Sequence, residues 1–180
     1  MDRLETERLM LEKWSKKDAR ELFAYASNPK VGPAAGWREH RSIGESKFRI
    51  KKIFIPNRIW KITMKDEGVA IGSIGFEPDQ KRPEVRAMEL GYSLAEEYWG
   101  RGIVPEAAEA VIDYGFRVVR LDIISIETAP DNLRSQRVIE KLGFVFEGNL
   151  RRSYRTIDDE VRDAYVYSIL REEWMKRTGG

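Results

Sequence analysis

Hydrophobic and polar residues alternate along several short stretches of the chain, which is the pattern of half-buried β-strands. The first such stretch covers residues 8–14. Two more, 58–65 and 69–76, are joined by Asp66-Glu67-Gly68, and this arrangement predicts a β-hairpin. Further strands are predicted over 85–94, 122–128, 144–155 and 162–170, the last two on either side of Asp158-Asp159.

Between these strands lie segments whose apolar residues recur at helical spacing. Ser15-x-x-Asp18 resembles an N-terminal cap, and Ser42-x-x-Glu45 has the form of a full capping box. The first helix is expected to end at Asn28-Pro29 and the second to end before Pro56. A third helix is predicted over about 104–117, and a fourth ends where Gly143 has the character of a C′ residue.

The order of these elements, β-α-α-β-β-β-α-β-α-β-β, is typical of a mixed α/β domain. Its front half should be antiparallel. Strand 85–94, the following helix and strand 122–128 form one crossover, which should be parallel and right-handed. We therefore expect residues 1–180 to form a single domain, with a central mixed, mostly antiparallel sheet of about seven strands flanked by about four helices.

Composition narrows the class of protein. The chain has 180 residues and no cysteine, which excludes disulfides, a thiolate zinc site and a cysteine nucleophile, and no metal site is predicted. No run approaches the length of a membrane span, and the N-terminal MDRLETERL cannot serve as a signal peptide, so we expect a cytoplasmic protein without a membrane partner. A formal net charge of +2 gives no case for a nucleic-acid partner.

Two glycines stand one residue apart before the third helix, in Gly100-Arg101-Gly102. Glycine in an ordered element costs about 0.5–1 kcal/mol relative to alanine, so the pair indicates unusual backbone angles or a close approach. The unpaired amides at the start of a helix bind anions such as phosphate, and a plain strand-to-helix turn is the alternative. A Rossmann fingerprint is incomplete because Pro105 replaces its third glycine, and no Gly-Lys-Ser/Thr of a Walker loop follows.

Several segments resemble the GNAT N-acetyltransferase superfamily. Residues 91–102, GYSLAEEYWGRG before a helix, resemble its acetyl-CoA pyrophosphate loop. Asn132-x-x-Ser135 with the following 140–144, EKLGF, resembles its second cofactor motif. Residues 6–11 and 165–174 resemble the branch of ribosomal-protein N-terminal acetyltransferases (RimJ/RimL-like), whose members are often homodimers. The chain departs from the usual loop at Glu97, where glutamine or arginine is common, and this implies a modest cost in binding.

The resemblance implies an enzyme that uses acetyl-CoA as co-substrate and transfers its acetyl group to a primary amine. In this branch the acceptor is the α-amine of a protein N-terminus. Because the chain has no cysteine to carry an acyl group, direct attack within a ternary complex is the simpler mechanism. A small amine such as a polyamine, an amino acid or an aminoglycoside is an alternative acceptor. Two further classes of protein stay open, a non-catalytic acyl-CoA-binding module and an unrelated nucleotide-binding protein.

On the cofactor side, the resemblance implicates backbone groups more than side chains. The backbone amides at the N-terminus of the third helix, here called the helix mouth, would hold the pyrophosphate. In the family, strand 85–94 splays from its neighbour, and its open edge would bind the pantetheine arm. The amide of Leu94 is also a candidate oxyanion donor. Asn132 would cap its helix and contact the cofactor. Ser135, one turn further on, is a candidate acid for the leaving thiolate, with a surface serine as the alternative. The candidate cofactor-binding residues are Tyr92, Ser93, Leu94, Trp99, Gly100, Arg101, Gly102, Ile103, Asn132 and Ser135.

On the acceptor side, Glu89 is the candidate general base, and it faces away from Met88 and Leu90 on the same strand. An exposed or ion-paired glutamate is the alternative reading of Glu89. Alternative candidate bases lie near the C-terminal hairpin, at Tyr154, Tyr165 and Tyr167, where packing of a strand tyrosine is the plainer reading. An α-amine has a reference pKa of about 8, against about 10.4 for lysine, so water alone is a further candidate base. The candidate acceptor-binding residues are Trp37 and His40, between the first two helices, and Tyr154 and Tyr165, in the C-terminal hairpin.

Overall fold

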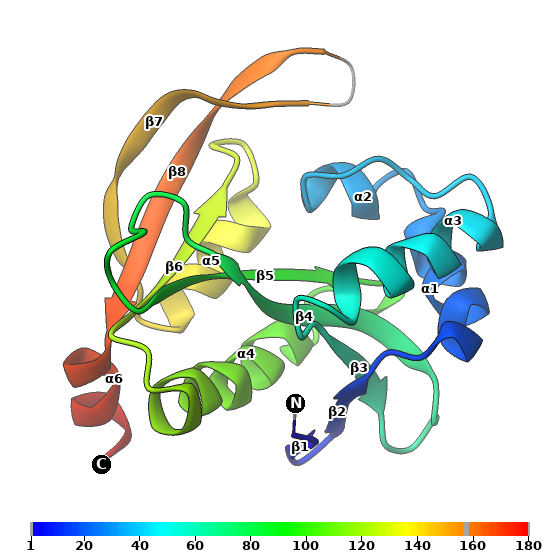
Figure 1. Ribbon diagram of the computed structural model, residues 1–180, viewed down its shortest axis with the longest axis horizontal. Helices are drawn as coiled ribbons and strands as arrows, with labels where there is room; N and C mark the ends of the chain where they lie inside the picture. The colour runs from blue at the N-terminus through cyan, green and yellow to red at the C-terminus, as the bar shows by residue number, and fades with distance from the viewer. Residues whose placement is uncertain (1, 157–158, 180) are drawn as a thin grey trace. The chain divides into compact units, whose positions relative to one another are not determined.

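The computed structural model describes residues 2–156 and 159–179 (Figure 1). By the contacts between its residues, the chain divides into two compact units. The first unit comprises Met1–Phe76 and Tyr92–Ala110, and the second comprises Glu77–Gly91 and Val111–Gly180. Two strands and one long helix contribute residues to both units. The expectation that residues 1–180 form a single domain stays a prediction.

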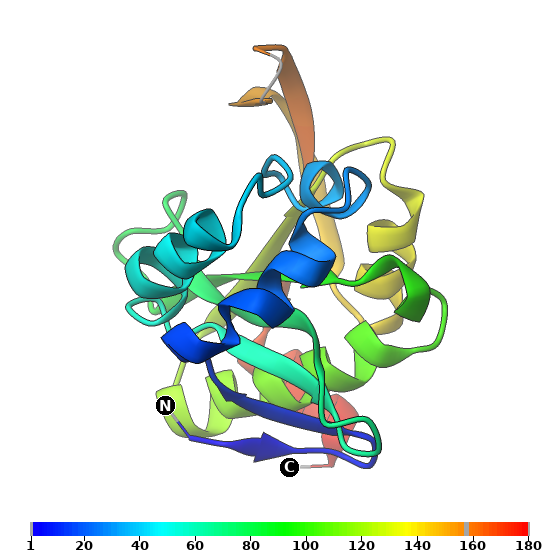
Figure 2. The same ribbon diagram turned by 90° about the vertical axis from the view of Figure 1, so that its right-hand side faces the viewer.

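The sheet of the first unit is antiparallel. Its strands follow the order β1 (Leu4–Glu5), β2 (Leu9–Lys13), β3 (Trp60–Met64) and β4 (Ala70–Pro78). The first three lie side by side at the bottom of Figure 2. The strand expected at 8–14 and the hairpin over 58–76 are therefore confirmed. β1 was not predicted, because two residues are too few to show an alternation.

The helices of the first unit begin where the serine caps predicted them. Ser15 accepts a hydrogen bond from the Lys17 amide, and its own amide donates to Asp18 at 2.7 Å, as in a capping box. Ser42 accepts from the Glu45 amide at 3.1 Å, but the Glu45 carboxylate accepts from the amide of Arg41, one residue before the cap. The predicted full capping box at Ser42 is therefore only half formed, because the Glu45 carboxylate accepts from Arg41 and not from the amide of the cap residue.

Short helical turns extend these helices and enclose a core. The helical elements of this unit are η1 (Lys16–Asp18), α1 (Ala19–Ala26), α2 (Val31–Ala34), α3 (Ile43–Arg49), the π-turn η2 (Ile50–Phe54) and η3 (Glu96–Tyr98). Their apolar residues pack with those of the neighbouring strands and loops into one buried cluster, which includes Trp14, Leu22, Tyr25, Ile50 and Phe54.

The sheet of the second unit is mixed. Its strands follow the order β5 (Ala87–Leu94), β6 (Ile123–Thr128), β8 (Val161–Leu170) and β7 (Val145–Arg155). β5 and β6 are parallel, and the other two pairs are antiparallel, which confirms the predicted parallel crossover and the C-terminal hairpin. The turn expected at Asp158-Asp159 includes Asp158, which lies outside the described residues.

The crossover helix α4 (Ile103–Tyr114) ends in a π-turn, η4 (Gly115–Val119), and α5 (Leu133–Lys141) follows β6. Gly143 has φ +82° just after α5, as expected of a C′ residue. A helix that was not predicted, α6 (Arg171–Thr178), buries Trp174 with its ring 6.5 Å from that of Phe116. Over the described residues the structure has eight strands and six α-helices, so the predicted mixed α/β class is confirmed with slightly more elements.

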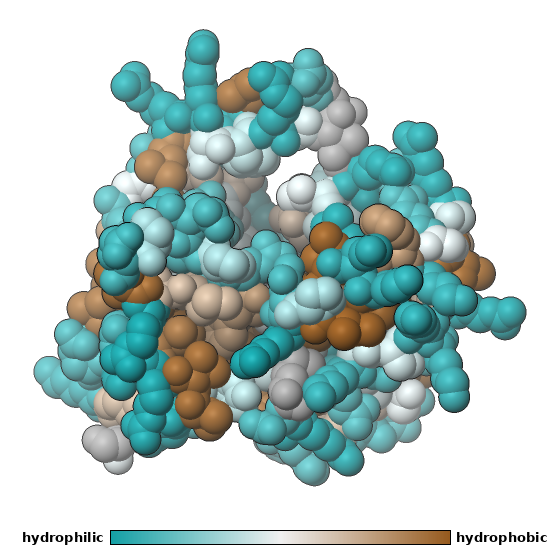
Figure 3. Space-filling view, viewed as in Figure 1, coloured by the Kyte–Doolittle hydropathy of each residue, from teal (hydrophilic) through white to brown (hydrophobic). Residues whose placement is uncertain are grey.

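Hydrophilic residues predominate on the face shown in Figure 3, where hydrophobic residues form separate patches. In the described part of the chain, no helix is both long enough and apolar enough to cross a bilayer.

Candidate active site

The Gly100-Arg101-Gly102 loop, in the first unit, leads directly into the N-terminus of α4. Gly100 and Gly102 have φ values of +75° and +74°, in the left-handed region that side chains avoid. Gly102 accepts the first helical hydrogen bond, from the Glu106 amide at 3.3 Å, so the preceding amides of α4 point out of the helix. The glycines therefore serve an unusual backbone path, and that path suits an anion at the helix end.

Trp99 follows η3 and contacts the end of β5, and its expected contact with the cofactor stays a prediction. Its backbone amide donates to Glu96 within η3 at 3.1 Å, so this amide is already hydrogen-bonded within the chain. Its indole Nε1 donates to the carbonyl of Leu94 at 2.8 Å. The backbone amide of Ala95, the residue after Leu94, donates to the Ile71 carbonyl at 2.8 Å. Trp99 thus holds the end of β5 in place, next to the loop.

Glu106 anchors this loop to the N-terminal strand, a role that no sequence motif indicated. Its carboxylate accepts from the Thr6 hydroxyl at 2.5 Å, from the Arg8 amide at 2.9 Å and from Arg8 Nε at 2.6 Å. Burial acts to raise the pKa of Glu106, but these donors outweigh burial and lower it. Arg8 also donates to the Arg101 carbonyl at 3.1 Å. The Thr6-Glu7-Arg8 segment therefore sets the position of the helix mouth.

Two contacts shape the end of β5 in the first unit. A Cβ on Gly72 would lie 2.5 Å from the Ser93 carbonyl oxygen, so only glycine lets β4 approach β5 this closely. The Ser93 side chain is buried and its hydroxyl lies 2.9 Å from that of Ser73. Ser93 can therefore offer a ligand its backbone but not its side chain, in line with the expected use of backbone groups.

The parallel ladder is shorter than its strands. Across the described residues of the second unit, β5 and β6 pair from Ala87 with Ile123 to Glu89 with Ser125, whereas β6 continues to Thr128. Gly91, just past the last pair, is exposed, and a Cβ there would meet nothing within 4 Å. This geometry supports the splayed strand edge that the resemblance implies for binding the pantetheine arm.

Asn132 and Ser135 form the N-terminus of α5. The Asn132 side-chain oxygen accepts from the Ser135 amide at 3.2 Å, so the predicted cap is present. Ser135 is only 9% exposed, which contradicts the alternative of a plain surface serine. Their contact with the cofactor stays a prediction.

Replacing Ser135 with alanine should slow acetyl transfer by about tenfold or less, because thiols ionise near pH 8.5 and CoA leaves readily without an acid. The dissociation constant of acetyl-CoA should hardly change. Stopped-flow thiol release and calorimetry measure the two quantities. Ser153→Ala, at an exposed serine of β7, is the control. A strongly weakened affinity with an unchanged rate would instead make Ser135 a binding residue.

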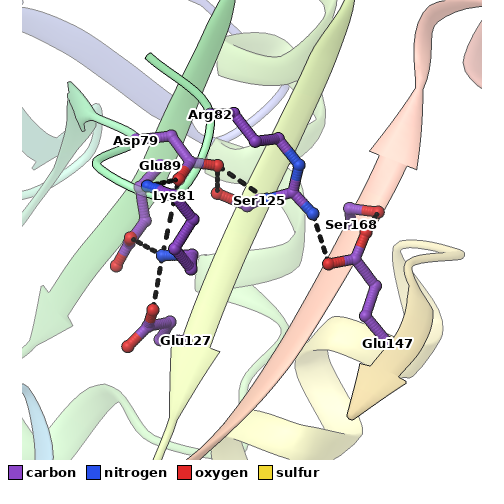
Figure 4. A network of polar contacts seen from close by, with 8 residues as sticks. All are labelled: Asp79, Lys81, Arg82, Glu89, Ser125, Glu127, Glu147 and Ser168. Atoms are coloured by element: carbon purple, nitrogen blue, oxygen red, sulfur yellow. Dashed lines mark hydrogen bonds and ion pairs between the residues drawn. The ribbon is translucent and has the colours of Figure 1, made fainter. Parts of the chain in front are cut away.

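Glu89 lies on β5 and is one of three carboxylates near the ammonium of Lys81. Lys81 Nζ donates to Glu89 at 2.9 Å and also to Glu127 (Figure 4). Burial raises the pKa of Glu89 above its usual range, although the hydrogen bond and charge of Lys81 act against this. The ion-paired glutamate considered from the sequence is therefore what the structure contains, and a base of raised pKa is still compatible with it.

The four candidate acceptor-binding residues lie in different surroundings. His40 is buried, with Nδ1 2.8 Å from the Ser46 hydroxyl, and burial lowers its pKa. Trp37 is half-buried, with its ring 5.1 Å from that of His40. Tyr165 packs against Phe146, and Tyr154 is half-buried on β7. Trp37 and the tyrosines thus present partly exposed rings, and a role for any of the four in binding an acceptor stays a prediction.

Comparison with known proteins places this geometry in a family. Residues 8–145 match the Acetyltransferase (GNAT) domain. The chain is 32% identical to an uncharacterized N-acetyltransferase of Bacillus licheniformis, p20, over 97% of this chain and 99% of that protein. It is 33% identical to a second uncharacterized N-acetyltransferase, YoaA of Bacillus subtilis, over 93% of this chain and 96% of that one.

A third relative and a solved structure extend the match. The [ribosomal protein uS5]-alanine N-acetyltransferase of Escherichia coli is 31% identical over 55% of this chain and 57% of its own. The crystal structure of a GNAT-family acetyltransferase from Bacillus anthracis superposes with a TM-score of 0.85 at 26% identity, over 96% of this chain and all of that one. The resemblance stated from the sequence is thereby confirmed. The chain belongs to the GNAT acetyltransferase family, as an N-acetyltransferase with acetyl-CoA as co-substrate.

Proposed function

We propose that the acceptor is the α-amine of a protein N-terminus. The observation that carries this proposal is Glu89, a carboxylate on β5 whose pKa is raised by burial. An α-ammonium has a pKa of about 8 and gives its proton to such a base far more easily than a lysine ammonium of about 10.4. The relative that acts on the alanine of ribosomal protein uS5 supports the same acceptor class.

In the proposed reaction the acetyl group moves in one transfer. Glu89 takes a proton from the α-ammonium, and the neutral nitrogen attacks the thioester carbonyl carbon. The C–N bond forms and the C–S bond breaks, while the amide of Leu94 donates to the carbonyl oxygen. Ser135 gives its proton to the departing thiolate and regains one from solvent. The acetylated nitrogen loses its remaining extra proton to solvent, and Glu89 releases the proton that it took, so that the transfer frees one proton overall. Direct attack without an acyl-enzyme is the simpler course, since the chain has no cysteine to carry the acetyl group.

The test is a set of acceptors incubated with acetyl-CoA, with thiol release and mass spectrometry as readouts. The set contains a peptide with a free N-terminal alanine, the same peptide N-terminally blocked but carrying a lysine, spermidine and an aminoglycoside. We expect acetylation of the free peptide, at its α-nitrogen, and none of the blocked one.

Two outcomes would contradict the proposal. Transfer to spermidine or to the aminoglycoside alone would make the protein a small-amine acetyltransferase. Acetyl-CoA binding in calorimetry with no thiol release for any acceptor in the set would favour a binding module.

A further inference from the structure

A row of polar side chains crosses one face of the sheet in the second unit (Figure 4). Glu89 of β5 pairs with Ser125 of β6, and Ser125 pairs with Ser168 of β8, so the three occupy one rung. Residues on one rung, and residues two apart on a strand, share a face of the sheet. Glu127 is two residues beyond Ser125, so the carboxylates of Glu89 and Glu127 lie on the same face of neighbouring strands.

Asp79 anchors the segment that follows β4 to this row of side chains, through Ser125. Its side chain is completely buried and accepts hydrogen bonds from the Ser125 hydroxyl at 2.8 Å, Arg82 Nη1 at 2.8 Å and the Lys81 amide at 2.9 Å. Burial acts to raise the pKa of Asp79, but these donors outweigh burial and lower it, so Asp79 is ionised. Arg82 continues to Glu147 of β7, which ties the segment to a second strand.

The anchored segment places the ammonium of Lys81 among three carboxylates. Nζ donates to Glu89 at 2.9 Å and to Glu127, and it lies 3.5 Å from Asp79 Oδ1. Burial acts to lower the pKa of Lys81, but the hydrogen bonds to Glu127 and Glu89 outweigh it and raise that pKa. Lys81 therefore carries its charge at every pH at which the protein would work.

We propose that Lys81 is a positioning residue that holds the Glu89 carboxylate ionised and in one orientation, with Asp79 as its anchor and Glu127 as a competing partner. This inference rests on the proposed role of Glu89 as the base for the acceptor amine. Lys81 acts on the reaction only through Glu89. Burial favours the neutral form of the half-buried Glu89 carboxyl, whereas a base must be ionised to accept a proton. The positive charge of Lys81 offsets this effect of burial.

The charged groups facing Glu89 act on it in opposite directions. Burial is the largest influence and raises the pKa of Glu89; the hydrogen bond and charge of Lys81 lower it, and the charges of Glu127 and Asp79 raise it. These groups come from the segment after β4 and from β6. Removing the positive charge at Lys81 must therefore raise the pKa of Glu89. Removing the negative charge at Glu127 must lower the pKa of Glu89, because that charge raises it directly and because Lys81 then pairs with Glu89 more fully.

The experiment follows the Glu89 carboxyl by carbon-13 NMR titration in wild type, Lys81→Met, Lys81→Arg and Glu127→Gln, beside the pH profile of kcat/KM for amine acetylation. We expect the titration midpoint of Glu89 to move to higher pH in Lys81→Met and to lower pH in Glu127→Gln. Lys81→Arg should restore it towards wild type, and the acidic limb of kcat/KM should move in the same directions. Lys176→Met, at an exposed lysine of α6, should move neither.

An unchanged Glu89 midpoint in folded Lys81→Met would overturn the inference, and so would a shared loss of rate in Lys81→Met and Glu127→Gln without any shift. Thermal unfolding reports whether each variant is folded. If Lys81→Met does not fold, the same shift to higher pH in Lys81→Gln decides the question, because the shift in Glu127→Gln would also arise without Lys81. The titration needs no acceptor, so failure of the proposed function would appear as absent amine acetylation while the coupling of Lys81 to Glu89 is still measured.

Discussion

Replacing Glu89 with glutamine is expected to lower kcat/KM for acetyl transfer at neutral pH by roughly 10²–10⁴-fold, the contribution of a positioned general base. Glutamine keeps the size of the side chain and removes the proton acceptor. Most of the lost rate should return as the pH rises, because an α-amine with a pKa of about 8 then loses its proton to water. In wild type the rate falls as the pH drops through the pKa of Glu89, which burial raises. That acidic limb should be absent from the pH–rate profile of the variant.

Glu127→Gln is the matched control for this change. It also removes one carboxylate partner of Lys81, so it alters the charge of the network by the same amount. The plateau rate of Glu127→Gln should fall far less than that of Glu89→Gln. Equal losses in the two variants would assign the effect to the ion-pair network, and a wild-type profile for Glu89→Gln would leave water as the base.

The elements that could be predicted are those with long periodic patterns. α4 and α5 repeat their apolar spacing over at least nine residues, and the strands of the hairpin, β7 and β8, are the longest of the described chain. All four were predicted to within a few residues. The missed helices show no such pattern. α2 has only four residues and contains Gly32 and Pro33, which disfavour helix. α6 is polar almost all round and buries a single residue, Trp174, which gives no amphipathic stripe.

Local and tertiary contacts account for different parts of the site. The Gly100-Arg101-Gly102 mouth and the Asn132 cap are local arrangements, so a short stretch of sequence contains their whole signal. The contact of Arg8 with Glu106 joins residues 98 apart, and no local pattern reports it. His40 had the sequence context of a surface loop, yet it is buried by its contacts with Ser46 and Trp37. Tertiary contacts of this kind decide burial and charge pairing, and they could not be predicted from local sequence patterns.

Gly102→Val is expected to weaken acetyl-CoA binding at least tenfold, or by about 1.4 kcal/mol, while the protein stays folded. Gly102 has φ +74°, and protein atoms leave room for a side chain, since a Cβ there would meet only Arg8 Nη2, at 3.6 Å. The cost is therefore in the backbone, because a β-branched residue strongly disfavours this region. The loop must leave its present path, and the amides at the mouth of α4 then no longer converge on one anion. Calorimetry with acetyl-CoA measures the loss.

Two further variants decide whether backbone strain alone explains the result. Gly179→Val introduces the same residue at φ +72° with nothing within 4 Å, at the end of α6, and should leave the dissociation constant unchanged. Gly102→Ala carries a smaller strain and should fall between wild type and Gly102→Val, because alanine lacks the β-branch. An unchanged dissociation constant in Gly102→Val would show that the loop is a turn without a role in holding the pyrophosphate, and the cofactor's phosphates would then have to be bound elsewhere on the chain.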